Sequence, residues 1–335
     1  MAQIRSINIS PALINTACAW ASSYDQLKAL YSSPFTGAVT TRTSTLKGYN
    51  ESSSCGVVFT SSSTSSLNSY GYSPRPLSAY LGWVKEIVSE TISSSNGKPL
   101  PVKPFIISIT ACSTEELKSM IGLIQDLRAT PTFASLIAIE LNTSCPNVSS
   151  TSPSGYVPDS IRPLLQTLAE AHMRDKSLTI GLKLPPYTFR GQFDAMISLL
   201  REFNYEDGDT GRQNCFAFLT CTNTLGNSLL FPDQVTEAMT IPEAKIAPDF
   251  AVPTVTGGLA GEAIHALSLG NVYTFRRHLD DEDDGLRGIS IIGVGGVTSP
   301  AALSRMTKAG ASVVGVATLL GKEGVKAFEI LSAQI

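Results

Sequence analysis

Eight short runs rich in β-branched and other apolar residues recur along the chain, and segments with helical periodicity separate most of them. This alternation is typical of repeated βα units, whose strands form one parallel sheet. Eight such units predict a (β/α)8 TIM barrel, with functional residues and long inserted loops at the carboxyl ends of the strands. The expected strands cover residues 13–15, 37–42, 105–110, 136–142, 178–184, 216–221, 290–294 and 312–317.

Local signals mark where several helices begin. Residues 114–128 carry apolar side chains at helical spacing, and Ser113 with Glu116 forms the pattern of a capping box. A second helix is expected over 158–172. Residues 299–309 begin with an N-cap serine and a first-turn proline, which predicts a third helix.

Composition excludes several classes of protein. The 335 residues are 43% hydrophobic, which predicts a buried core, and we expect a single domain over 1–335. A net charge of −3 leaves no basic excess for a dedicated nucleic-acid binder, so the expected partner is a small molecule. The apolar runs are far shorter than the roughly 20 residues of a membrane helix, which favours a soluble, cytoplasmic protein without a membrane partner.

The cysteines and histidines form neither a metal-binding nor a disulfide pattern. The six cysteines contain no C-x-x-C pair, and only three histidines are present. We therefore expect no metal site, and we expect free thiols of which one or two can do chemistry.

Two stretches interrupt the alternation. Residues 52–73 contain ten serines, and residues 223–257 contain four prolines with little periodicity. A serine-rich stretch can be a flexible linker, or it can be a long functional loop that follows a barrel strand. The acidic run over 280–285 is expected to be a solvated turn.

Polar and nucleophilic side chains follow the fourth and sixth expected strands. Cys145 lies between Asn142 and Asn147, and Asn223 with Thr224 comes directly after the sixth strand. An accessible thiolate can act as a general base or acid. Carboxamides suit a flat, amide-rich substrate because each offers donors and an acceptor. The alternatives are a packed loop cysteine and local turn hydrogen bonds from Asn and Thr.

A lysine and several glycines favour an anionic ligand. Lys183 occupies an otherwise apolar strand, where an inward ammonium group requires an anion or an electron-rich ring, whereas the alternative is a lysine that snorkels outward. The last two expected strands end in glycine-containing segments, residues 293–296 and 315–318, and Gly257-Gly258 comes before them. Backbone N–H groups there can bind a phosphate, although tight turns would use the same residues. Flavin mononucleotide (FMN) would use both features, with its phosphate at the glycines and its ring at Lys183.

Six short motifs of the chain resemble those of the dihydroorotate dehydrogenases in order and approximate spacing. The resemblance covers nearly the whole chain. The segment Lys183-Leu184-Pro185-Pro186-Tyr187 is similar to the class 1A branch, whose members are soluble homodimers that use fumarate as oxidant. The other motifs are Asn142-x-Ser144-Cys145-Pro146-Asn147, Asn223-Thr224-x-Gly226-Asn227, Gly257-Gly258-x-x-Gly261, Gly295-Gly296 and Lys322-Glu323-Gly324.

The resemblance implies FMN-dependent oxidation of (S)-dihydroorotate to orotate, a step of pyrimidine biosynthesis. It implies that Cys145 takes the proton from C5 while a hydride passes from C6 to the flavin nitrogen N5, and that Lys183 stabilises the reduced flavin. The residues implied to hold the substrate are Arg42, Asn68, Asn142, Asn147, Asn223 and Thr224. Those implied to contact FMN are Ala17, Arg42, Thr43, Asn142, Lys183, Thr222, Gly257, Gly258, Gly295, Gly296, Ala317 and Thr318.

The chain departs from the family pattern at four places: Arg42, residues 68–74, the loop over 148–155, and Ala317, which replaces a glycine. Arg42 occupies the position of a lysine, and residues 68–74 read Asn-Ser-Tyr-Gly-Tyr-Ser-Pro in place of Asn-Ser-Met-Gly-Leu-Pro-Asn. Two alternatives therefore stay open: an FMN oxidoreductase that acts on another pyrimidine, and a barrel that binds flavin or ligand without turnover. Arg42 favours a carboxylated substrate. No apolar helical extension precedes the first strand, which disfavours quinone and leaves fumarate as the expected oxidant.

Overall fold

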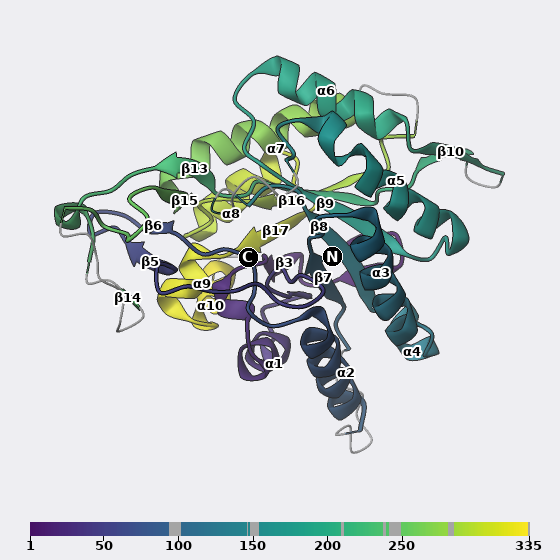
Figure 1. Ribbon diagram of the computed structural model, residues 1–335, viewed down its shortest axis with the longest axis horizontal. Coiled ribbons are helices and arrows are strands. Elements are labelled where there is room, and N and C mark those ends of the chain that lie inside the picture. The colour runs from purple at the N-terminus through teal and green to yellow at the C-terminus, as the bar shows by residue number, and fades with distance from the viewer. Residues whose placement is uncertain are drawn as a thin grey trace.

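Eight parallel strands form the centre of the molecule, in the order β3-β17-β16-β12-β9-β8-β7-β4 (Figure 1). A parallel bridge between Ile14 and Ala38 joins β3 to β4, so the two ends of the sheet meet and close a barrel. The computed structural model describes residues 1–93, 102–145, 147, 154–208, 211–236, 249–280 and 285–333, and the backbone of residues 239–240. The barrel strands are β3 (Leu13–Asn15), β4 (Val39–Thr40), β7 (Phe105–Ile109), β8 (Ile137–Asn142), β9 (Thr179–Leu184), β12 (Phe218–Cys221), β16 (Ser290–Val294) and β17 (Val313–Val316).

All eight strands expected from the sequence are present, which confirms the predicted (β/α)8 barrel. The strand expected over 37–42 differs most, because β4 is only two residues long. Thr41 N still donates to Ile106 O at 3.0 Å, but Arg42 N donates to Ala21 O at 3.0 Å, outside the ladder. The chain therefore departs from the ladder at Arg42, at the carboxyl end of the barrel, and pairs with β7 again through a parallel bridge between Ser44 and Ile109.

Helices surround the barrel, and the local signals in the sequence mark their beginnings correctly (Figure 1). Ser113 accepts a hydrogen bond from Glu116 N at 3.2 Å, while the Glu116 carboxylate caps Cys112 N at 2.9 Å, one residue earlier than a capping box requires. Ser299 accepts from Ala302 N at 3.2 Å. The helices are α1 (Tyr24–Ser32), α2 (Leu77–Ser93), α3 (Thr114–Arg128), α4 (Pro131–Ala134), α5 (Pro158–Arg174), α6 (Arg190–Arg201), α7 (His265–Asp280), α8 (Pro300–Lys308), α9 (Thr318–Glu323) and α10 (Lys326–Ser332), with 3₁₀ turns at Ala19–Ala21, Pro232–Gln234 and Glu262–Ile264.

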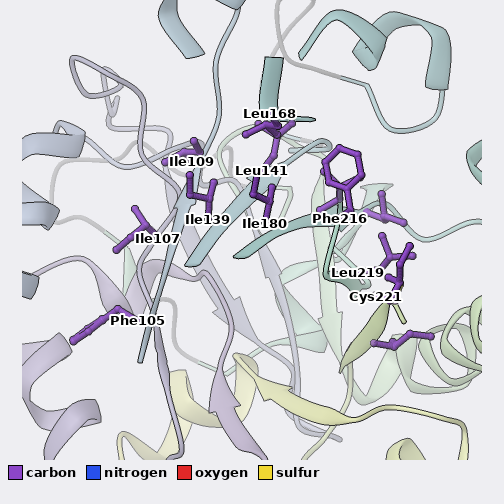
Figure 2. Packing of buried hydrophobic residues seen from close by; sticks show 14 of the residues in the cluster. Phe105, Ile107, Ile109, Ile139, Leu141, Leu168, Ile180, Phe216, Leu219 and Cys221 are labelled. Atoms are coloured by element: carbon purple, nitrogen blue, oxygen red, sulfur yellow. The ribbon is translucent and has the colours of Figure 1, made fainter. Parts of the chain in front are cut away.

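Side chains of the barrel strands alternate between an outer and an inner layer. On β7, Phe105, Ile107 and Ile109 belong to the large apolar cluster between the sheet and the helices (Figure 2). The residues between them, Ile106 and Ser108, are also buried, but on the inner side of the barrel. Both layers are buried because helices cover the outside and side chains fill the inside, which explains why the strands read as continuous apolar runs.

A hairpin of β1 (Ala2–Ile4) and β2 (Ile7–Ile9) covers the amino ends of the barrel strands. Its Ile4, Ile7 and Ile9 are buried in one cluster with apolar residues from the first half of the inner layer. The amino end of the barrel is therefore filled by apolar packing, which leaves the carboxyl end as the open one.

A second sheet lies beside the carboxyl end of the barrel, at the left of Figure 1, in the strand order β13-β15-β6-β5-β14. The serine-rich stretch supplies two of its strands, so the interpretation of that stretch as a flexible linker is wrong. Val58 and Leu67 from these strands pack with Ala251 and Val252 in a small apolar core. The strands are β5 (Gly56–Phe59), β6 (Ser65–Asn68), β13 (Leu225–Ser228), β14 (Met239–Thr240) and β15 (Gly257–Gly261).

The remaining features lie at the periphery. Strands β10 (Asn204–Asp207) and β11 (Gly211–Asn214) form a two-stranded sheet of their own. None of the six cysteines, all of which the structure describes, is in a disulfide. Within the described residues, no helix is both long and apolar enough to cross a membrane. Most of the acidic run expected as a turn, residues 281–284, lies outside the described residues.

A buried histidine near the amino end of the barrel predicts a pH-dependent stability. The Nδ1 of His172 lies 3.1 Å from Leu178 O, its Nε2 lies 3.1 Å from the Tyr205 hydroxyl, and Arg5 Nη1 lies 3.0 Å from Nδ1. Burial, and then the positive charge of Arg5, lower the pKa of His172 to about 4. The unfolded chain binds this proton near pH 6.5, so the folded state loses stability as the pH falls from about 6.5 to about 4.

Urea unfolding of the wild type and of His172→Gln across pH 7 to 4 measures this effect. We expect the stability of the wild type to decrease across this window, and we expect a shallower decrease in the variant, because its glutamine does not titrate. Parallel curves for the two proteins would contradict the assignment.

Candidate active site

One large pocket opens at the carboxyl ends of the barrel strands, next to the second sheet. Its lining comes from the ends of β3, β4, β8, β9, β12, β16 and β17, and from β6 and β15. The space measures ≈ 1020 Å³ when its open mouth is included. The parallel strands thus bring residues that are distant in sequence to one edge.

Cys145 follows β8 and faces the loop that follows β6. Its Sγ lies 3.9 Å from Tyr70 O, and the thiol is partly exposed in the pocket. Asn147 Nδ2 donates to Tyr70 O at 2.8 Å and to Asn68 Oδ1 at 3.1 Å. Asn68 Nδ2 in turn donates to Gly258 O at 3.1 Å. A thiol and two carboxamides therefore share one wall of the pocket.

Two further carboxamides lie side by side on the inner face of the barrel. Asn142 Nδ2 donates to Thr43 Oγ1 at 3.0 Å, and Asn223 Nδ2 donates to Asn142 Oδ1 at 3.1 Å. Asn223 Oδ1 accepts from Thr224 N at 2.9 Å. These four residues line the pocket, and the strand ends bring together side chains that are as far apart in sequence as Thr43 and Asn142, which are separated by 99 residues.

Lys183 points into the pocket, so the outward alternative is wrong. Its neighbours Leu182 and Leu184 belong to the outer apolar layer, which leaves Lys183 on the inner face of β9 with only 5% of its surface exposed. Its Nζ donates to Ala17 O at 3.1 Å. Among the described residues this is the ammonium group's one hydrogen bond, so two of its three N–H donors are left for a ligand.

Arg42 makes several contacts within the site. Its Nη2 lies 2.8 Å from Glu51 Oε1 and donates to Gly71 O at 3.2 Å and to Tyr72 O at 3.3 Å. The guanidinium carbon lies 5.2 Å from the centre of the Tyr70 ring, within the range of a cation–π contact. Arg42 therefore holds the loop that carries Tyr70, and Glu51 partly neutralises its charge. Glu51 was not expected from the sequence, because no local pattern links it to Arg42.

A second thiol, Cys18, also lines the pocket. Burial raises the pKa of this thiol to about 11, although Lys183 and Arg42 act in the opposite direction. Near neutral pH Cys18 is therefore a neutral thiol and a poor proton acceptor. Cys145, which is partly exposed, is the better candidate for a base.

The glycines after β16 form a tight backbone segment at the pocket. Gly295 and Gly296 have φ angles of 127° and 67°, which residues other than glycine rarely adopt. A Cβ on Gly295 would lie 2.0 Å from Ser268 Oγ, and one on Gly296 would lie 2.5 Å from His265 Cβ. Both positions therefore need glycine, and their backbone can approach a ligand closely.

The structure places Gly257 and Gly258 differently from the other expected residues. They lie on β15 and do not belong to the pocket lining, where Ala260 and Gly261 from the same strand appear instead. A Cβ on Gly257 would meet Asn68 O at 2.5 Å, so this glycine allows β15 to approach β6 closely. The two residues thus contact Asn68 through the pairing of β15 with β6 and do not line the pocket themselves.

The remaining expected residues do line the pocket, and several that were not expected join them. Trp20, Tyr70 and Tyr72 are the largest additions. A single aromatic residue outside the barrel strands carries no sequence signal that separates a pocket wall from a packed surface. The expected residues in the lining are Ala17, Arg42, Thr43, Asn68, Asn142, Cys145, Asn147, Lys183, Thr222, Asn223, Thr224, Gly295, Gly296, Ala317 and Thr318.

The charges of the lining favour an anionic ligand. Among the described lining residues, Arg42 and Lys183 carry positive charge and none carries a carboxylate. The lining residue Thr16 has a buried hydroxyl without a hydrogen-bond partner in the described part of the chain, which fits a polar ligand group. The described residues contain no cluster of three or more His, Cys, Asp or Glu that could hold a metal ion.

A matched pair of glycine substitutions tests the packing behind the pocket. Gly296 and Gly324 share a positive φ, of 67° and 62°, but a Cβ on Gly324 would meet nothing within 4 Å. We expect Gly296→Ala to lower the free energy of unfolding by about 1 to 3 kcal/mol more than Gly324→Ala, because it adds overpacking to the shared backbone strain. Chemical denaturation of both variants measures the difference, and equal losses would show that the space behind Gly296 is not restrictive.

Comparison with known proteins gives one consistent likeness. A sequence model of the family "Dihydroorotate dehydrogenase" matches residues 12–335. The chain is 31% identical to the "Dihydroorotate dehydrogenase (fumarate)" of Trypanosoma brucei brucei over 70% of its length, an alignment that spans 63% of that relative. It is 28% identical to the protein of the same name from Trypanosoma cruzi, over 92% of this chain and 90% of that relative.

Proposed function

Because the chain belongs to the dihydroorotate dehydrogenase family, we propose that it oxidises (S)-dihydroorotate to orotate, with FMN as the bound flavin and fumarate as the oxidant. Membership of the family implies a flavin cofactor, and FMN is the specific proposal. The observation that carries the proposal is the single pocket that combines Cys145, four carboxamides and two cationic side chains. By resemblance to the class 1A branch, the proposal also includes that the protein forms a homodimer.

The residues of the pocket fit a flavin phosphate and a flavin ring. Gly295, Gly296, Ala317 and Thr318 present backbone at the ends of the last two barrel strands, where phosphates bind in many such barrels. Lys183 offers two N–H donors deeper in the pocket, where a reduced, anionic ring gains from a nearby positive charge. When bound, the flavin supplies the hydride acceptor.

The protein's own residues would bind the substrate and move one proton. Asn68, Asn142, Asn147 and Asn223, with Thr224, supply donors and acceptors for a pyrimidine ring, and Arg42 supplies a cation for its carboxylate. Cys145 as thiolate would take the C5 proton, so the C5–H bond breaks, an S–H bond forms, and the electron pair becomes the C5–C6 double bond as hydride leaves C6.

Substitution of Cys145 tests the base. We expect Cys145→Ala to slow anaerobic reduction of the flavin by dihydroorotate by about 10² to 10⁴, the usual contribution of a general base, while orotate still binds. Cys112→Ala, at an exposed thiol outside the pocket, is the control and should keep the wild-type rate. Stopped-flow absorbance follows the flavin band, and restoration of its colour by fumarate tests the oxidant. Undiminished reduction in Cys145→Ala would remove Cys145 from the mechanism, and a colourless purified protein would contradict FMN.

A second candidate function is oxidation of a neutral dihydropyrimidine. The observation that favours it is the 2.8 Å contact between Arg42 and Glu51, since this carboxylate competes with a substrate carboxylate for the same cation. Reduction of the flavin by dihydrouracil but not by dihydroorotate would decide for this candidate.

Removal of the Glu51 charge tests the competition directly. We expect Glu51→Gln to increase the affinity for orotate several-fold, and to leave the affinity for uracil unchanged, because only orotate carries a carboxylate. Glu90→Gln, which removes the same charge from the exposed pair with Lys28, is the control. Calorimetric titration of each protein with both ligands measures the effect. Weaker orotate binding by Glu51→Gln would show that Glu51 orients Arg42 for the ligand instead of competing with it.

A further inference from the structure

We propose that Glu140, a carboxyl group inside the barrel below the pocket, is a positioning residue that fixes the direction of a hydrogen-bond chain to Asn142. This inference rests on the proposed function, because Asn142 is one of the carboxamides assigned to the substrate. Glu140 itself does not line the pocket.

Glu140 lies on the inner face of β8, two residues before Asn142. Only 1% of its surface is exposed. The Ser108 hydroxyl on β7 donates to Oε1 at 3.0 Å, and the Thr220 hydroxyl on β12 donates to Oε2 at 2.6 Å. A polar group at this depth is costly unless it is satisfied, and both of its oxygens are. The position is therefore built around a hydrogen-bond acceptor.

The acceptor determines the direction of the hydrogen bonds that follow. Ser108 has one hydroxyl proton, which it donates in the hydrogen bond to Glu140. The contact between Ser108 Oγ and Thr43 Oγ1, at 2.9 Å, must then use the proton of Thr43. The Thr43 oxygen is left to accept, and it accepts from Asn142 Nδ2 at 3.0 Å. Each proton in the chain thus points toward Glu140.

The far end of the chain lies in the pocket. Because Asn142 turns its NH₂ group toward Thr43, its Oδ1 faces Asn223 Nδ2 at 3.1 Å and Ser144 N at 3.2 Å. A flipped amide would place N–H groups against these donors and leave Thr43 without one. One orientation of Asn142 is therefore selected, and with it the orientation of Asn223.

Glutamine keeps this role in one of its two orientations and loses it in the other. Its NH₂ group would donate to Ser108 or to Thr220, whereas a carboxylate only accepts. When it donates to Ser108, the serine proton turns toward Thr43, and the Thr43 proton can no longer point to Ser108. The chain then favours the opposite orientation of Asn142. When the NH₂ group donates to Thr220 instead, the glutamine oxygen still accepts from Ser108 and the chain is unchanged. An apolar residue, which offers no acceptor in either case, is therefore the decisive substitution.

The two hydroxyl groups on Glu140 form a matched pair for a test. Ser108 and Thr220 are equally buried and contact the same carboxyl group, but only Ser108 continues to Thr43. The variants are Ser108→Ala, Glu140→Leu and, as the control, Thr220→Val. Two readouts are measured on each holoprotein: the NMR signal of the Asn142 side-chain amide, assigned by its loss in Asn142→Ala, and the dissociation constant of orotate.

We expect Ser108→Ala and Glu140→Leu to shift the Asn142 amide signal and to weaken orotate binding about three- to tenfold, the effect of one lost hydrogen bond. Thr220→Val should leave both readouts near those of the wild type, even if it lowers the melting temperature. Equal effects of Ser108→Ala and Thr220→Val would overturn the proposal, because Glu140 would then act by packing alone. An unchanged amide signal in Ser108→Ala would overturn it as well.

Two further measurements cover a variant that does not fold and a wild type that does not bind orotate. If Ser108→Ala does not fold, Thr43→Val breaks the same chain one bond later, and Thr43→Ser should restore it. A wild-type protein that does not bind orotate would contradict the proposed function, while the amide signal would still decide whether Glu140 orients Asn142.

Discussion

The alternation of side chains along the barrel strands is the constraint on which the rest of the structure depends. Because successive residues of a strand point to opposite faces, β8 places Ile137, Ile139 and Leu141 against the helices, and Glu140 with Asn142 inside the barrel. The outer row stabilises the fold by burying apolar surface. The inner row turns from apolar at the amino end to polar at the carboxyl end, so the same strand serves the core and the site.

The polar part of the barrel interior behaves as one connected structure. Strands β7, β8 and β12 each contribute one residue to the group around Glu140, and β8 and the segment after β4 continue it to Asn142. A network of this kind is favourable only when every member is satisfied, since an unpaired polar group inside a protein costs about 1 to 3 kcal/mol. The pocket floor is thus built from barrel strands, whereas the loops after β8 and β6 carry Cys145 and Tyr70 on the pocket wall.

The sequence was sufficient for the barrel, because strand runs, helix periods and caps are local patterns. It placed all eight barrel strands and the N-caps at Ser113 and Ser299. It also placed Lys183 and Asn142 at strand ends, which a parallel barrel necessarily gathers at one edge. The sequence was less informative for residues 52–73. Small polar residues occur both in flexible linkers and in hairpins that pair with a distant strand, so composition does not distinguish the two.

What the sequence by itself determined is the architecture and most of the pocket's chemical groups, because both follow from spacing along single strands. Only the tertiary structure decided which of these groups meet. It paired Arg42 with Glu51, set Gly257 against Asn68 O, and connected Glu140 to Asn142 through Ser108 and Thr43. These contacts join segments that are distant in sequence, and their geometry depends on how strands and loops pack in three dimensions, which no local pattern encodes.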